Sequence, residues 1–94
     1  MVNIKLFSIL AEKANKREFN IEIEDEILFL NIIPKIFQAT NRIFKSYVFD
    51  IDKNSFNDFI TIVINEKIAD KNEIMNKVIN NDDTIAFLTP IEGG

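Results

Sequence analysis

The 94-residue sequence contains no cysteine, no histidine and no tryptophan. Without cysteine, the chain can form no disulfide, no thiolate nucleophile and no zinc–thiolate cluster. Without histidine, it has no Ser-His or Cys-His catalytic pair and no imidazole metal ligand. These absences exclude most familiar catalytic and metal-binding chemistry, and we expect no bound metal.

Glycine is almost as scarce. An average domain has about 7% glycine, whereas this chain has two glycines, Gly93 and Gly94, which are its last residues. The body of the chain therefore contains neither a P-loop nor a dinucleotide-binding fingerprint. Its turns must use Asn and Asp, the other residues that tolerate positive φ; the candidates are Asn15, Asn65, Asn81 and Asp82.

Composition and charge indicate one folded domain spanning residues 1–94. The chain is 47% hydrophobic and 28% charged, unlike a disordered tail. A net charge of −4 argues against nucleic acid as a partner. No apolar run approaches the roughly 20 residues of a membrane span, and residues 6–11 are too short for the apolar region of a signal peptide. We therefore expect a soluble cytoplasmic protein with no membrane partner.

Apolar periodicity places the N-terminal elements. Alternation predicts a strand over residues 2–6 and another over residues 18–24, joined by a turn or a short helical excursion. Helical spacing then predicts a helix over about 28–40. Pro34 leaves two starts for this helix, because proline removes a hydrogen-bond donor: a start near residue 31, or an earlier start with a kink.

Residues 42–58 are the least regular segment, and we interpret them as a polar surface loop. Four apolar residues within it nevertheless favour burial: Phe44, Val48, Phe49 and Ile51. Residues 50–54 resemble the opening of a calcium-binding loop. Ser55 replaces the required glycine and Thr61 the required bidentate glutamate, so metal binding is not predicted.

The remaining sequence alternates strands with short connections. It predicts a strand over 59–64, a tight turn, a return strand beginning at residue 67 and a last strand over 84–89. Asp70 followed by Glu73 is typical of a capping box, and predicts a short helix that buries Ile74, Val78 and Ile79. The order β-β-α-β-(β)-(α)-β predicts an α+β fold with the main helix on one face of the sheet.

The chemically distinctive feature is the glycine pair at the end of the chain. Two residues without a Cβ can enter a narrow channel and place a terminal carboxylate in another protein's active site. A frayed end is the plainer interpretation of terminal glycines. Glycine is absent elsewhere, however, even where turns would normally use it, which favours a working tail.

Residues 83–94, DTIAFLTPIEGG, resemble the C-terminal signature of the ubiquitin-like sulfur carriers. The similarity is closest to the MoaD-like small subunits of molybdopterin synthase, with the ThiS-like thiamine carriers as relatives. Residues 6–8 and 62–65 resemble the family's first strand and its strand ending in a turn asparagine. The resemblance implies a β-grasp (ubiquitin-like) fold with a mixed four- to five-stranded sheet.

The resemblance also implies a carrier that is not catalytic alone. A ubiquitin-activating-type adenylating enzyme would join AMP from ATP to the Gly94 carboxylate, and sulfur would then replace AMP to give a thiocarboxylate. The partners would be that enzyme and the large subunit of molybdopterin synthase, with no tightly bound cofactor. The tail residues expected to bind partners are Pro90, Ile91, Glu92 and Gly93.

Strand parity predicts a docking surface on the sheet face away from the helix, at Phe7, Val63 and Leu88. The alternative is that residues 42–58 fold over this face. Charge adds a second indication, because residues 1–47 carry seven cations and six anions, whereas residues 48–94 carry four and nine. An acidic half that bears the tail would be steered toward cationic sites for ATP or a phosphorylated pterin, although a solvated acidic face explains the charge equally well.

Three other functions remain open from the sequence. The chain could carry sulfur for thiamine thiazole synthesis, or modify proteins through an isopeptide bond at Gly94. It could also be a small binding module with a frayed tail.

Overall fold

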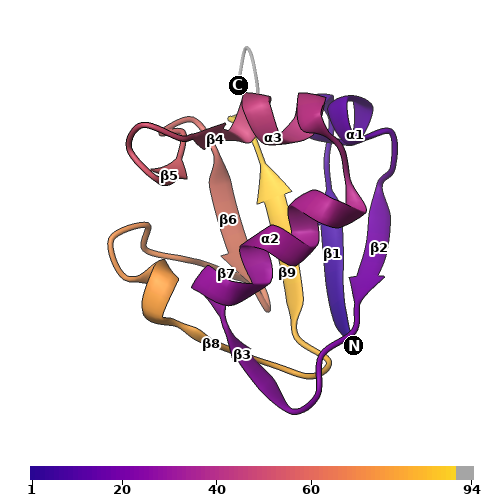
Figure 1. The fold of residues 1–94 in the computed structure, drawn as a ribbon, viewed down its shortest axis with the longest axis vertical. Helices are drawn as coiled ribbons and strands as arrows, with labels where there is room; N and C mark the ends of the chain where they lie inside the picture. The colour runs from indigo at the N-terminus through magenta and orange to yellow at the C-terminus, as the bar shows by residue number, and fades with distance from the viewer. Residues whose placement is uncertain (91–94) are drawn as a thin grey trace.

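The computed structural model describes residues 1–90, and its centre is a five-stranded sheet (Figure 1). The strands are ordered β2-β1-β9-β6-β7, with the bounds β1 Val2–Leu6, β2 Glu18–Ile21, β6 Thr61–Ile64, β7 Lys67–Ile68 and β9 Thr84–Leu88. β1 and β9 run parallel, and the other neighbouring pairs are antiparallel. The mixed sheet predicted from the sequence is therefore confirmed.

Helix α2, Phe29–Ala39, crosses one face of this sheet (Figure 1). Its apolar side buries four residues, namely Phe29, Ile32, Ile33 and Ile36. Of the two predicted starts, the earlier one is closer to the structure, since α2 is capped by Leu28, begins at Phe29 and contains Pro34 as its sixth residue. The interval predicted for the helix, about 28–40, agrees with the observed one to within a residue at each end.

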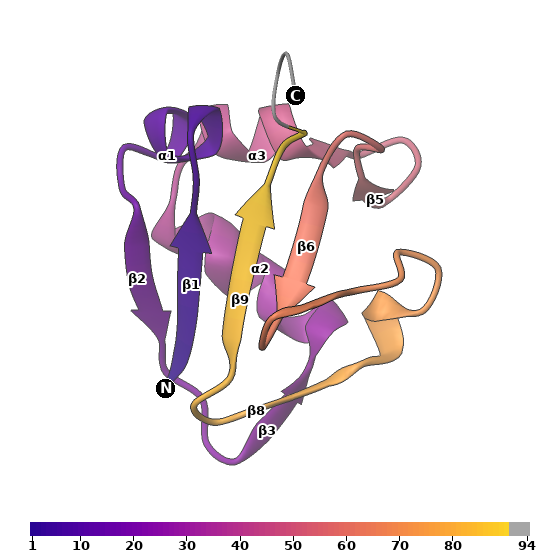
Figure 2. The same cartoon turned by 180° about the vertical axis from the view of Figure 1, so that it is seen from behind.

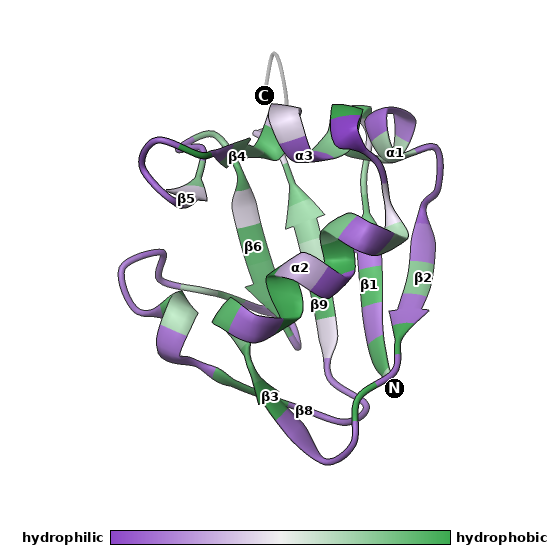
Figure 3. Ribbon diagram, viewed as in Figure 1, coloured by the Kyte–Doolittle hydropathy of each residue, from purple (hydrophilic) through white to green (hydrophobic). Residues whose placement is uncertain are grey.

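The core lies between α2 and the inner residues of the strands. Every second residue of the central strands is buried, as the burial of Ile62, Ile64, Ile85 and Phe87 shows. Hydrophobic positions alternate with polar ones along β1, whereas β6 and β9 are apolar for most of their length (Figure 3). Alternation of this kind predicts one covered and one open sheet face, which is the arrangement found.

Residues 42–58 differ from the predicted surface loop. They form α3, Arg42–Val48, followed by a two-stranded hairpin of β4, Phe49–Asp50, and β5, Ser55–Phe56. Helix α1, Ile9–Ala14, packs beside α3 at the end of the sheet where β9 finishes (Figures 1 and 2).

Aromatic packing explains why this segment is ordered. The ring of Phe44 lies 6.3 Å from that of Phe87 in an edge-to-face arrangement, and the ring of Phe56 lies 5.6 Å from Phe87. The side chain of Asn41 caps α3 by accepting a hydrogen bond from the Phe44 amide at 2.7 Å. Burial is confirmed for Phe44 and Val48, and Phe49 is half-buried against the core. The expectation was wrong for Ile51, which is 72% exposed at the hairpin turn.

The helix predicted after Asp70 is also wrong in type. The segment contains only a short 3₁₀ turn, η1 Ile74–Asn76, and continues as strand β8, Val78–Asn80, which pairs with β3, Glu26–Leu28. The Asp70 carboxylate accepts from the Asn72 amide at 2.8 Å, and the Glu73 side chain forms no capping box. Pairing of β8 with β3 leaves Val78 41% exposed while Ile79 and Ile74 are buried.

Turns without glycine use residues with positive φ. Three of the four candidates adopt this conformation: Asn15, Asn65 and Asp82, with φ of 58°, 50° and 73°. Asn81 does not, because Asp82 takes that position in the turn between β8 and β9. Ser8, Asn54 and Glu66 complete the set, and Ser8 and Glu66 occupy positions where glycine would be favoured.

Candidate functional site

The face of the sheet opposite α2 is open in the structure (Figure 2). The register aligns three apolar residues across it, since Val63 pairs with both Ala86 and Ile68. Leu88, the last residue of β9, pairs with Thr61 in the next row. We call Phe7, Val63, Ile68, Ala86 and Leu88 the sheet patch.

Phe7 joins this patch from the end of β1. Leu6 pairs with Phe87 in the parallel β1–β9 ladder, so the next residues along the two strands are Phe7 and Leu88. Phe7 is 44% exposed and Ile68 is 77% exposed, whereas Val63 and Leu88 are half-buried. Apolar side chains in two adjacent rows of an open sheet face indicate an interaction surface more strongly than a single exposed side chain does.

The alternative in which residues 42–58 cover this face does not hold. Phe44 and Phe56 pack against Phe87, whose side chain lies on the α2 face of the sheet. The segment therefore extends the covered side of the molecule and leaves the sheet patch open.

The tail begins where β9 ends, next to the sheet patch. Thr89 is half-buried and Pro90 is exposed. Beside them lies a hollow of about 630 Å³, lined also by Ile9, Tyr47 and Phe59. The rings of Tyr47 and Phe59 meet edge to face with centroids 5.4 Å apart, and Phe59 is 40% exposed. An aromatic surface thus lies beside the residues from which the tail departs.

A polar clip at the opposite end fixes β9 in the sheet. The carboxylate of Asp83 accepts from the Asn65 amide side chain and from the Asn80 backbone amide, each at 2.8 Å. Asn65 in turn accepts from the Thr84 amide at 2.9 Å. The aspartate that belongs to the family signature is therefore a positioning residue, because it ties the start of β9 to the β6–β7 turn.

Within residues 1–90, no three Asp or Glu side chains come together as potential metal ligands. Partial burial lowers the pKa of the Lys71 ammonium below its ordinary value, although the nearby Asp58 carboxylate opposes this by raising it less. The Lys71 ammonium donates to the backbone oxygens of Asn57 and Asp58 at 3.0 and 2.7 Å, and so joins two loops. Within residues 1–90, no helix is long and apolar enough to cross a membrane.

The structure brings together most of the site residues that it describes. Phe7, Val63 and Leu88 share the open face, and Pro90 follows at the end of β9. The predicted residues Ile91, Glu92, Gly93 and Gly94 lie outside the described residues. Sequence reasoning missed Ile68 and Ala86 in the patch and the aromatic pair beside the tail. Strand parity in the hairpin could have identified Ile68, whereas the Tyr47–Phe59 contact depends on the fold of residues 42–58.

These features define a class of protein: a small ubiquitin-like β-grasp domain with an open sheet face and a last strand that ends next to it. The sequence model of the ThiS family matches residues 4–94. No curated protein matches the chain.

Solved structures share the fold across nearly the whole chain. SAMP1 from Haloferax volcanii is 24% identical with a TM-score of 0.81, covering 99% of this chain and 98% of that one. A chain of the Amycolatopsis orientalis BexX/CysO complex is 17% identical with a TM-score of 0.78 over 100% of both chains. A putative molybdopterin converting factor subunit 1 from Pyrococcus furiosus is 18% identical with a TM-score of 0.71, covering 96% and 97%.

The protein belongs to the ThiS family, and its β-grasp fold is confirmed. It is a member of the small ubiquitin-like sulfur carriers and modifiers, as the resemblance of its C-terminal signature implied.

Proposed function

We propose that this chain is a sulfur carrier that acts through a thiocarboxylate at Gly94, as the small subunit of a molybdopterin synthase. The observation that carries the proposal is the arrangement at the end of β9. Leu88 and Ala86 place the sheet patch on the strand from which the tail departs, so a partner that docks on the patch lies next to the tail.

The chemistry takes place on the tail and needs no catalytic group from the carrier. A carboxylate oxygen of Gly94 attacks the α-phosphorus of ATP, the bond to the β-phosphate breaks, and pyrophosphate leaves. Hydrosulfide from a sulfur donor then attacks the acyl carbon, the bond between that carbon and the phosphate oxygen breaks, and AMP leaves with the oxygen. The product is a thiocarboxylate, and the absence of cysteine leaves no thiol in the chain to attack it.

Charge supports an encounter with phosphate-binding partners. Residues 48–94 carry nine Asp and Glu against four Lys, and they include β6, β9 and the tail. Enzymes that bind ATP or a phosphorylated pterin present cationic sites, so opposite charges would accelerate association and align the tail.

The first experiment is intact-mass spectrometry of the full chain coexpressed with an adenylating enzyme of the ubiquitin-activating type. We expect a fraction in which one oxygen is replaced by sulfur, and no such fraction after deletion of Gly94. Only unmodified carboxylate in the presence of an active adenylating enzyme would contradict the proposal. Lys53→Ala, in the exposed β4–β5 turn, is a matched control that should leave the modified fraction unchanged.

The recipient of the sulfur is tested separately. The thiocarboxylated chain is supplied to a molybdopterin synthase large subunit with the pterin precursor, and in parallel to a thiazole synthase. We expect turnover of thiocarboxylate to carboxylate only with the former. Turnover only with the thiazole synthase would assign the chain to thiamine synthesis.

A second candidate function is protein modification, which the similarity to a small archaeal modifier protein favours. It predicts an isopeptide bond between Gly94 and lysines of other proteins. Antibody to the tail would then detect a ladder of larger species on a denaturing gel, and the ladder would disappear after deletion of Gly94.

A further inference from the structure

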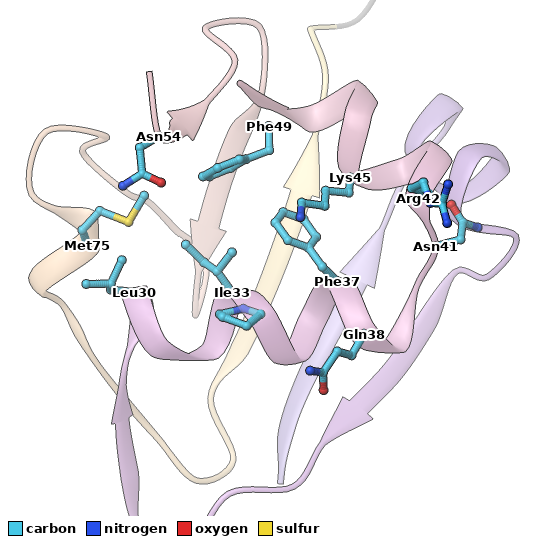
Figure 4. A pocket seen from close by; sticks show the side chains of 11 residues that line it. Leu30, Ile33, Phe37, Gln38, Asn41, Arg42, Lys45, Phe49, Asn54 and Met75 are labelled. Carbon is cyan, nitrogen blue, oxygen red and sulfur yellow. The ribbon is translucent and has the colours of Figure 1, made fainter. Parts of the chain in front are cut away.

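A groove lies on the side of the molecule that carries α2, opposite the sheet patch (Figure 4). Its volume is about 520 Å³, within the range of about 300–1,000 Å³ for sites that hold drug-sized ligands. The apolar wall comes from α2, the β4–β5 hairpin and η1, and comprises Leu30, Ile33, Pro34, Phe37, Phe49 and Met75.

The groove is polarised along its length. Leu30 and Met75 lie at one end, and Arg42 lies at the other, with Lys45 between them (Figure 4). The Lys45 ammonium is 5.6 Å from the centre of the Phe37 ring, which holds it over the apolar wall. A ligand that fits must therefore offer an apolar group at one end and negative charge toward the other.

Charge sets this groove apart from the rest of the chain. Among the described residues that line it, none is Asp or Glu, although the chain as a whole carries a net charge of −4. The whole stretch of residues 27–49 contains three cations and no anion. The complement of this surface is an acidic segment with an apolar anchor.

The last four residues of this chain have that composition. Ile91 supplies an aliphatic side chain, and Glu92 and a carboxylate at Gly94 supply two negative charges. Four extended residues span at most about 14 Å. The groove follows α2 from Leu30 to Gln38, which is about 12 Å at 1.5 Å of rise per residue.

We propose that this groove binds the C-terminal residues 91–94 of a second copy of the chain. Ile91 packs against Leu30 and Phe49, and the carboxylates of Glu92 and Gly94 face Lys45 and Arg42. Docking in this way occupies the group that an activating enzyme needs, so self-association competes with activation. The inference rests on the proposed function, because both require a free carboxylate at Gly94.

The absence of native cysteine allows a direct test. Full-length chain bearing Pro90→Cys with a nitroxide label, at natural isotope abundance, is mixed with ¹⁵N-labelled native chain, each at about 1 mM, where a site with a millimolar dissociation constant is partly occupied. Pro90 is exposed and precedes the segment proposed to dock, so residues 91–94 stay native. Only contacts between copies broaden amide signals in this mixture. We expect broadening at Leu30, Phe37 and Lys45.

Charge reversal provides the matched control. Arg42→Glu in the ¹⁵N-labelled copy should reduce the broadening at least fivefold, and Lys45→Gln should reduce it at least twofold. Lys35→Glu should leave it unchanged, because Lys35 is an exposed cation of α2 that does not line the groove. Unchanged amide shifts outside the groove would show that each variant is folded.

Several outcomes would overturn the inference. These are no broadening, broadening confined to Phe7 and Val63 on the sheet patch, or broadening only when label and ¹⁵N are on the same copy. The experiment does not depend on sulfur chemistry. A chain that docks its tail but is never thiocarboxylated would refute the proposed function alone.

Discussion

Glu66 occupies a backbone conformation that suits glycine. It follows Asn65 in the two-residue turn between β6 and β7; φ is 50° at Asn65 and 72° at Glu66. Two successive positive φ values are typical of a type I′ hairpin turn, in which Asn-Gly is preferred. A side chain with a Cβ costs about 1–2 kcal/mol in the left-handed region.

We expect Glu66→Gly to raise the free energy of unfolding by about 0.5–1 kcal/mol, because relief of strain exceeds the added entropy of the unfolded chain. Urea denaturation monitored by circular dichroism measures this change. Lys67→Gly is the matched control: it lies in β7, where loss of the side chain should destabilise by about 0.5–1 kcal/mol. Equal effects of the two variants would show that Glu66 is not strained.

The polar clip is the other feature that depends on single residues. Asp83→Ala removes an acceptor of two hydrogen bonds and should lower the free energy of unfolding by about 1–3 kcal/mol. Asn65→Gly removes the partner side chain while keeping the turn. Combining them should give a coupling energy of at least about 0.5 kcal/mol by denaturation. Additive effects would mean that the Asn65–Asp83 bond contributes nothing to holding β9.

At the level of elements, α3 shows how tertiary packing decides which apolar side chains of a short helix are buried. Phe44 is fully buried against Phe87, whereas the preceding Ile43 is 62% exposed. Phe44→Ala should therefore lower the free energy of unfolding by about 3–5 kcal/mol. Ile43→Ala should change it by less than about 0.5 kcal/mol. Thermal unfolding of both variants checks this, and similar losses would mean that α3 is misplaced.

Apolar periodicity was sufficient to predict the central sheet strands and α2, but not the structure of the segments between them. The strands predicted at 2–6 and 84–89 match β1 and β9 because alternation reports directly on a sheet with one covered face. The structure of residues 42–58 was not predicted, because their burial comes from aromatic contacts with Phe87, which is distant in the sequence. Likewise, Val78 joins a strand because β3 supplies a pairing partner, a long-range contact that overrides local helical spacing.

The two surfaces of the whole molecule differ in how far they could be foreseen. Parity placed Val63 and Leu88 on one face from sequence alone, and the register then added Ile68 and Ala86. The groove on the α2 face could not be predicted, since Met75 and Phe49 reach it from elements that the sequence did not reveal. The sheet patch and the groove therefore lie on opposite sides of the molecule, so the proposed partner and the proposed second copy would use separate surfaces.

The sheet patch can be tested with one exposed side chain. Ile68 is 77% exposed in the patch, and Ile51 is 72% exposed at the β4–β5 turn on another part of the surface. Because both side chains are largely in water, replacement by Glu should leave the fold intact, and only Ile68→Glu should place a carboxylate in the proposed interface. We expect Ile68→Glu to raise the KM of the adenylating enzyme for the carrier about tenfold, which corresponds to about 1.4 kcal/mol of binding energy.

The kcat of the adenylating enzyme should not change, since the reacting group is at the tail and not on the patch. Steady-state pyrophosphate release measures both constants, and Ile51→Glu should match the native chain. Equal KM values for the two variants would place the enzyme's docking site elsewhere, and a fall in kcat alone would mean that the patch aligns the tail for reaction and does not bind the enzyme.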